Sequence, residues 1–386
     1  MEAIAVPLLR LGRLELDARL RGLRPGPAAS DLVVTAAVEV PESESERQYA
    51  WDVAWADATR EAEALGAGQR TAQALATGAG TAPPDGSRVV VAAHGEVLLA
   101  RWLPPGTAGS VRVGPLPHLR EVAAAAARRP AYVVVLADRD GAAVIAHTAG
   151  DLHPARHYET GARPGTQPDP HPGRPPAQHH GERHLTGREP LSGGEQNAAF
   201  TAGRVAEAAA AVSAHVILGA GDEHILDAVS KHLPGSLGPV TAIASGPVSA
   251  DSDEHLGALI ATALDEITGE AIDAVGALVA SAAGGPTPGA VRGIEPVAAQ
   301  LTEQQVAVLL VASDIGGDSD GSRYWVGSRP TEFGAGDPGT GIPVPLEDGL
   351  VWAALHQDAI VVQLADRSGP LAGQPTAALL RRGAAS

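Results

Sequence analysis

One segment constrains the fold of this chain more than any other: an apolar β-hairpin that runs directly into a long stretch rich in proline, glycine, arginine and histidine. Two apolar runs around the turn residues Asp138–Gly141 predict the hairpin over Ala131–Thr148. Helical sequence resumes near Glu195. Loops longer than roughly 12–15 residues are uncommon inside compact domains and are usually functional or disordered. We therefore expect a long loop over residues 149–193.

The charge of this loop differs from that of the rest of the chain. The protein has a formal net charge of -17, which argues against a general nucleic-acid binder, because phosphate contacts require clustered Lys and Arg. Residues 151–190 are instead neutral, and they hold many of the histidines, which gain charge readily beside an anion. Two interpretations stay open from composition alone: an anion-contacting probe and a solvated, partly disordered insertion.

The composition also bounds the class of protein. The chain of 386 residues suggests two or three domains, whose cores must be filled by Ala, Val and Leu because aromatic residues make up only 3%. The absence of cysteine excludes disulfides and a cysteine nucleophile. The N-terminal sequence lacks the features of a signal peptide, and no run of about eighteen apolar residues predicts a membrane span. We expect a cytoplasmic protein without a membrane partner.

Hydrophobic periodicity predicts three consecutive α/β blocks, over residues 1–130, 131–246 and 247–386. The predicted helices are Glu44–Leu65, Leu119–Arg129, Glu195–Ala214, Asp222–His232, Asp253–Ala283, with a break near Gly269, and Ile294–Gln300. Outside the featured hairpin, the predicted strands are Leu32–Val40, Val89–Ala93, Val97–Trp102, His215–Gly219, Val240–Ala244, Val306–Ala312, Leu350–Ala354 and Ala359–Leu364. Residues 313–345 are expected to be irregular.

Several motifs match sequence patterns of enzyme sites, but the residues around each motif argue against that interpretation. Val216–Gly221 is half of a dinucleotide-binding fingerprint, but Asp222 and Glu223 would place two carboxylates where a pyrophosphate needs bare N–H donors. Helix capping by Asp222 is the better interpretation. The sequence Gly334–Gly339 also matches G-x-G-x-x-G, yet it lies in a Pro-rich stretch without a flanking helix. We predict no catalytic residue and no cofactor.

A metal role for the loop histidines is the weaker of two interpretations. His180 and His184 have the i, i+4 spacing of a metal pair on a helix, but Pro175 and Pro176 oppose a helix there. No carboxylate is obviously placed to complete such a site. We predict no metal site.

Three segments resemble the archaeal and eukaryotic class I peptide-release factors and their bacterial relatives: Tyr132–Val144, Arg204–Ala208 and Arg292–Leu310. Those relatives include actinobacterial release-factor-like proteins and the hibernation factor Balon. The resemblance covers roughly residues 120–312. It implies a middle domain carrying the long loop and a C-terminal L7Ae-like α/β domain, for which Asp358–Arg381 is similar to the closing hairpin and tail.

The resemblance also implies a role for the loop. In this family the middle-domain loop reaches the peptidyl-transferase centre, and in true release factors it carries Gly-Gly-Gln. The two candidates here, Gly165-Thr166-Gln167 and Gly193-Gly194-Glu195-Gln196, do not reproduce the triplet. Glu195 would place an acid where a developing oxyanion is repelled. Hydrolysis is therefore not expected, although a ribosome-rescue peptidyl-tRNA hydrolase that uses Gln167 or Gln196 stays open as the alternative.

The resulting hypothesis is a non-enzymatic, ribosome-binding translation factor that occupies the A site of idle or stalled ribosomes, as a hibernation factor does under stress. Arginine and histidine on an extended loop suit irregular RNA. The implied partners are the ribosomal RNA of the A site and the peptidyl-transferase centre, with elongation factor Tu as a further candidate. A third interpretation is a binding module that acts through acidic surfaces without RNA. The expected RNA-facing residues are Arg156, His157, Arg163, Gln167, Arg174, His179, His180 and Arg183.

Overall fold

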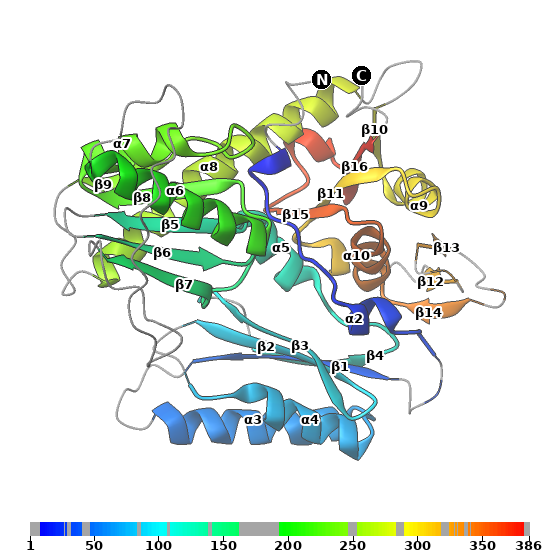
Figure 1. The fold of residues 1–386 in the computed structure, drawn as a ribbon. Helices are drawn as coiled ribbons and strands as arrows, with labels where there is room; N and C mark the ends of the chain where they lie inside the picture. Colours follow the sequence, from blue (N-terminus) through cyan, green and yellow to red (C-terminus); the bar gives the residue numbers. More distant parts are fainter. Residues whose placement is uncertain are drawn as a thin grey trace, which may run out of the picture. The chain divides into compact units, whose positions relative to one another are not determined.

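The computed structural model has a mixed α/β architecture and divides into two compact units (Figure 1). The first unit combines residues 1–131, 148–153 and 261–386, and the second combines residues 132–147 and 154–260. The predicted domain boundaries at residues 130 and 246 stay predictions. The structure describes residues 8–26, 28, 32–40, 47–82, 86–105, 109–137, 141–161, 193–245, 253–282, 289–317, 324–327, 329, 331–335, 339 and 341–381.

The N-terminal part of the first unit is an antiparallel sheet with two helices on one face. Its strands are β1 (Val33–Glu39), β2 (Ser87–Ala93), β3 (Glu96–Leu103) and β4 (Ser110–Gly114), in the order β3-β2-β1-β4. The helices are α3 (Arg47–Ala64) and α4 (Gln69–Ala79), and a short helix, α2 (Ala18–Gly22), precedes the sheet. The turn between β2 and β3 has positive φ at both His94 and Gly95, the geometry that matches the twist of a two-residue hairpin.

The C-terminal part of the first unit is a second layered α/β arrangement. Its main sheet has the order β10-β16-β11-β15, with β11 parallel to β15 and antiparallel to β16. The strands are β10 (Ala290–Arg292), β11 (Val306–Ala312), β15 (Ile360–Leu364) and β16 (Thr376–Leu380). The helices are α5 (Arg120–Arg128), α9 (Ile294–Thr302), α10 (Leu346–His356) and α8 (Asp253–Ala282), of which residues 253–260 belong to the second unit.

One hydrophobic core joins these two parts of the first unit. Leu99 and Leu119 from the N-terminal part and Leu309 and Trp352 from the C-terminal part belong to the same buried cluster. Burial of apolar side chains contributes roughly 25 cal/mol per Å². Segments more than 200 residues apart in the sequence therefore fold as one body, a property that no local pattern could show.

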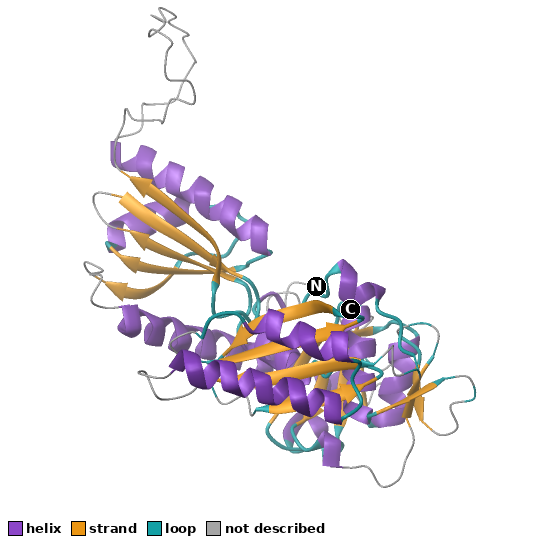
Figure 2. Cartoon of the chain, turned by 90° about the horizontal axis from the view of Figure 1, so that it is seen from below, coloured by secondary structure: helices purple, strands orange, loops and turns teal. Residues whose placement is uncertain are grey.

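The second unit is a five-stranded sheet in the order β7-β6-β5-β8-β9. Its strands are β5 (Tyr132–Ala137), β6 (Gly141–His147), β7 (Pro154–Gly161), β8 (Val216–Gly221) and β9 (Thr241–Ser245), and its helices are α6 (Gly193–Val212) and α7 (Glu223–His232). Strands β5, β8 and β9 are parallel, whereas β6 and β7 are antiparallel to their neighbours. Helices lie along the sheets of both units (Figure 2).

Most predicted elements agree with the structure within a few residues, and the helix over Asp253–Ala282 is continuous rather than broken near Gly269. The predicted strand Leu350–Ala354 is wrong, because these residues belong to α10. All residues from Leu346 to Leu355 are buried, and a short apolar run in that environment cannot be assigned to helix or strand by periodicity. No described helix is long and apolar enough to cross a membrane.

Three further expectations need correction. The loop does not begin at residue 149, because Pro154–Gly161 forms β7 and pairs with β6. Residues 313–345 are not wholly irregular, since they contain a small sheet of β12 (Tyr324–Val326), β13 (Phe333–Ala335) and β14 (Ile342–Val344). The segment Asp358–Arg381 is not a hairpin, because β11 lies between β15 and β16.

Candidate functional site

Two of the eight expected RNA-facing residues lie in the described part of the chain. Arg156 and His157 are exposed on β7. Among the described strands β7 pairs only with β6, so it forms an edge of the sheet of the second unit. The other six, Arg163, Gln167, Arg174, His179, His180 and Arg183, lie outside the described residues. The first two residues of the predicted RNA-facing set therefore lie on a regular strand.

A set of side chains that the sequence did not reveal lies beside this edge. The guanidinium carbon of Arg204 on α6 is 5.4 Å from the ring centroid of Phe200 and 5.9 Å from that of Tyr158 on β7. Both separations fall within the range of cation–π attraction. The only local signal was the i, i+4 spacing of Phe200 and Arg204, which places both on one face of a helix. The contact with Tyr158 depends on the packing of α6 against β7.

Of the two candidate hydrolytic sequences, one lies in the described part of the chain and one lies outside it. Gly193, Gly194 and Glu195 form the first turn of α6, where Glu195 is exposed. A helical turn restricts the backbone that a Gly-Gly-Gln loop would leave free. The other candidate, Gly165-Thr166-Gln167, lies outside the described residues.

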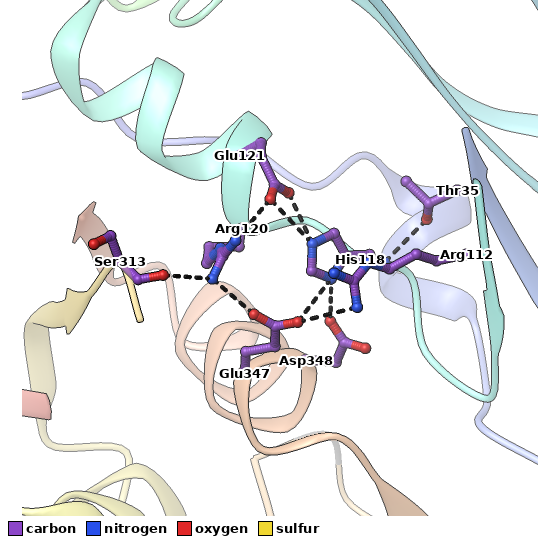
Figure 3. Close-up of polar contacts among 8 residues, drawn as sticks. All are labelled: Thr35, Arg112, His118, Arg120, Glu121, Ser313, Glu347 and Asp348. Atoms are coloured by element: carbon purple, nitrogen blue, oxygen red, sulfur yellow. Dashed lines mark hydrogen bonds and ion pairs between the residues drawn. The ribbon is translucent and has the colours of Figure 1, made fainter. Parts of the chain in front are cut away.

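The first unit contains a cluster of charged residues around His118 (Figure 3), and His118, Glu347 and Asp348 are its buried members. His118 lies just before α5 and is only 4% exposed. Its Nδ1 donates to Asp348 at 2.6 Å, and its Nε2 lies 2.9 Å from Glu121. The backbone N–H of His118 donates to the hydroxyl of Thr35 on β1 at 3.0 Å. Through its backbone and its imidazole, His118 therefore connects β1, α5 and α10.

Two arginines complete the cluster through Glu347 on the first turn of α10. The Glu347 carboxylate is 2.8 Å from Arg120 and 3.3 Å from Arg112, which lies on β4. Arg120 also contacts Glu121 at 3.0 Å and the carbonyl of Ser313 at 3.3 Å. Three carboxylates thus face two guanidinium groups and one imidazole.

The protonation of His118 follows from these contacts. Burial by itself lowers the pKa of His118, but the hydrogen bonds with Asp348 and Glu121 outweigh it and raise the pKa to about 9. Burial raises the pKa of Glu121, and the contact with His118 outweighs it and lowers the pKa to about 2. At neutral pH His118 is therefore a cation, and the cluster holds three positive and three negative charges.

The same geometry decides what this cluster could hold. The ligand atoms of His118, Glu347 and Asp348 lie within 4.8 Å of one another, as in a metal centre. Both imidazole nitrogens, however, already serve as donors, and Arg120 and Arg112 neutralise Glu347. A metal would have to displace these cations. A charged, buried imidazole also cannot act as a general base, so the arrangement fits a structural ion network.

The glycine-containing turn after β8 is structural as well. A Cβ on Gly221 would lie 1.8 Å from the carbonyl oxygen of Ala137, and the φ of Gly221 is +124°. Asp222 then caps α7 by accepting from the backbone N–H of His224 at 3.0 Å. The capping role predicted from the sequence is confirmed.

The second unit lies within a segment that resembles a known protein family. Residues 131–284 match the model of the bacterial archaeo-eukaryotic release factor family 2. These residues, fewer than half of the chain, are similar to that release factor family. The matched residues include the strands β5 and β8 and the helix α6. They also include Tyr132–Val144 and Arg204–Ala208, two of the segments in which the sequence resembles release factors. The similarity to Balon stays a prediction.

Solved structures with detectable similarity carry related names. They include Pelota from Archaeoglobus fulgidus (15% identity, 66% of this chain and 65% of that one, TM-score 0.28). An archaeal translation termination factor, aRF1, matches at 11% identity over 94% and 95% of the two chains, with a TM-score of 0.21. A model of ribosome-bound archaeal Pelota and ABCE1 matches at 14% identity over 96% and 95%, with a TM-score of 0.39. The chain thus spans about two thirds of the Archaeoglobus protein, and no curated protein matches significantly.

Proposed function

We propose that this protein is a ribosome-associated translation factor whose release-factor-like second unit contacts ribosomal RNA. The observation that carries the proposal is the family match over residues 131–284. The exposed cationic residues Arg156 and His157 on the sheet edge β7 support it, because they immediately precede the segment that the family resemblance directs toward the peptidyl-transferase centre. We propose that this segment occupies the A site of idle or stalled ribosomes.

Occupation without hydrolysis is the form of the function that the described residues favour. The Gly193-Gly194-Glu195 sequence lies in the first turn of a helix, and an exposed carboxylate stands where the developing negative charge of ester hydrolysis would be repelled. We propose a blocking role in dormancy or stress. Elongation factor Tu is the candidate protein partner.

Co-sedimentation with 70S ribosomes tests the proposal. The test variant replaces residues 162–192 by a Gly-Ser linker of equal length, which preserves β7 and α6. We expect the full chain to sediment with ribosomes and the replacement variant to sediment much less. Equal sedimentation of both would contradict the role of the segment, and no sedimentation of the full chain would contradict the function.

A charge-reversal pair separates phosphate contacts from a general change in charge. Arg156→Glu should weaken ribosome association and reduce its salt dependence, because each lost phosphate contact reduces the number of released counterions. Lys231→Glu is the matched control, since Lys231 is exposed on α7 of the same unit. A measurement of labelled peptide release from stalled ribosomes covers the alternative: release that is lost in Gln196→Ala or Gln167→Ala would replace blocking by hydrolysis.

A further inference from the structure

We propose that Phe200, Arg204 and Tyr158, here called the stacking surface, bind an unpaired nucleobase of single-stranded RNA. The proposal rests on the proposed function and gives it a specific chemistry outside the residues that the sequence indicated. Phe200 and Arg204 lie one turn apart on α6, and Tyr158 lies on the edge strand β7. All three belong to the second unit.

The exposure of Phe200 is the first observation. Its side chain is 57% exposed, while the packed face of α6 is formed by Ala198, Ala202 and Val205, each at most 2% exposed. Phe200 is therefore not required to fill the core. Exposed single apolar residues are common, so this feature alone would not indicate a site.

The arrangement of the neighbouring groups distinguishes Phe200 from an ordinary exposed residue. The Arg204 guanidinium lies within 6 Å of both the Phe200 and Tyr158 rings, and its side chain is 41% exposed. Aromatic rings and guanidinium planes are the groups on which proteins stack unpaired bases. In the stacking surface, the planar guanidinium of Arg204 already lies beside two aromatic rings. A nucleobase, which is also planar, could stack on these groups in the same way.

Charge complementarity favours RNA over an apolar protein segment. Arg156 is exposed two residues before Tyr158 on β7, and residues i and i+2 of a strand lie on the same face. Arg156 can thus meet a phosphate next to a base held by the stacking surface. Arg204 donates a guanidinium N–H to the Glu207 carboxylate at 2.7 Å, so the edge of the guanidinium binds an anionic oxygen while the cation lies within cation–π distance of the rings.

Fluorescence anisotropy with labelled single-stranded oligoadenylate at low salt tests the proposal, with a duplex of the same length as the comparison. We expect the protein to prefer the single strand. Loss of base stacking costs roughly 5- to 150-fold in affinity, so Phe200→Ala should weaken binding by that factor and Phe200→Tyr should retain it. Tyr49→Ala removes an aromatic residue that is 72% exposed on α3 of the first unit and should leave binding unchanged.

The outcomes separate this proposal from the proposed function. Absence of single-strand binding by the wild type, or equal binding by Phe200→Ala, would overturn the stacking surface even if ribosomes still co-sediment with the protein. Binding that depends on Phe200 but without ribosome association would support the surface and contradict the function. If Phe200→Ala abolishes ribosome association while the wild type binds no single strand, the surface contacts protein and the RNA assignment is wrong.

Discussion

The ion network around His118 and the stacking surface use the same residue types in opposite environments. Around His118, the imidazole and the carboxylates of Glu347 and Asp348 are buried, and the three carboxylates of the network are paired with an equal number of cations, so each charge is already satisfied by a neighbour. At the stacking surface Arg204 has one exposed carboxylate partner, Phe200 and Arg156 are exposed, and Tyr158 is half-buried. Satisfied buried charges stabilise and position elements, whereas exposed charges beside open rings can exchange their partners for a ligand. Burial, rather than residue type, separates the two roles.

Removing the central cation of the network should have the largest effect. His118→Ala leaves the buried Asp348 and the partly exposed Glu121 without their shared partner, and loss of one member of a buried ion pair such as His118–Asp348 costs about 3–5 kcal/mol. We expect a marked drop in the urea midpoint measured by circular dichroism. His157→Ala, at an exposed position of β7, should change the free energy of unfolding by no more than about 0.5 kcal/mol. Similar losses for both variants would contradict the distinction.

The pH dependence of stability should report the same network. The raised pKa of His118 means that its contribution is complete below pH 6.5 and is lost as the pH rises through 9. The lowered pKa of Glu121 means that its contribution is present above pH 4.5 and is lost as the pH falls through 2. We expect the free energy of unfolding to fall by up to about 3 kcal/mol on the alkaline side. His118→Gln should remove that alkaline decrease, and an unchanged profile would contradict the assignment.

Gly203, on the helix that carries part of the stacking surface, offers a test with a smaller expected effect on stability. It lies next to Arg204 on α6, and a Cβ at this position would meet no heavy atom within 4 Å. Gly203→Ala should stabilise the protein by about 0.5–1 kcal/mol, because alanine loses less backbone entropy in a helix. Thermal melting measures the effect. Gly221→Ala is the opposing control and should destabilise, since its Cβ would collide with the carbonyl of Ala137.

The smallest effect on stability is expected at Glu207. Its contact with Arg204 is exposed on both sides, and such pairs contribute about 0.3–0.5 kcal/mol on helices. Glu207→Gln should therefore leave the melting temperature almost unchanged while increasing the affinity for single-stranded RNA, because Arg204 no longer has a competing carboxylate. A large loss of stability would show that this pair resembles the buried network, and an unchanged affinity would contradict competition.

Local sequence patterns predicted the elements whose conformation is set by neighbouring residues. The hairpin β2–β3 follows from apolar strands around His94-Gly95, and the start of α7 follows from the capping residue Asp222. Of the eight expected RNA-facing residues, Arg156 and His157 lie in the described part of the chain, on β7. The sequence predicts a loop at both positions because β7 is stabilised by pairing with β6 rather than by its own propensity. Helix α10 was misassigned because it is buried on all sides, which removes the helical period from its sequence.

The sequence by itself determined the α/β class, the similarity of residues 131–284 to a release factor family and the unusual charge of the segment that follows β7. The tertiary structure alone decided that His118 meets Glu347 and Asp348 some 230 residues away, and that Tyr158 meets Arg204 across a strand and a helix. Propensity and periodicity act over a few residues, whereas the pKa of His118 and the ring contacts of Arg204 depend on which side chains packing brings within a few ångströms. Those contacts are a property of the fold, and no local pattern encodes them.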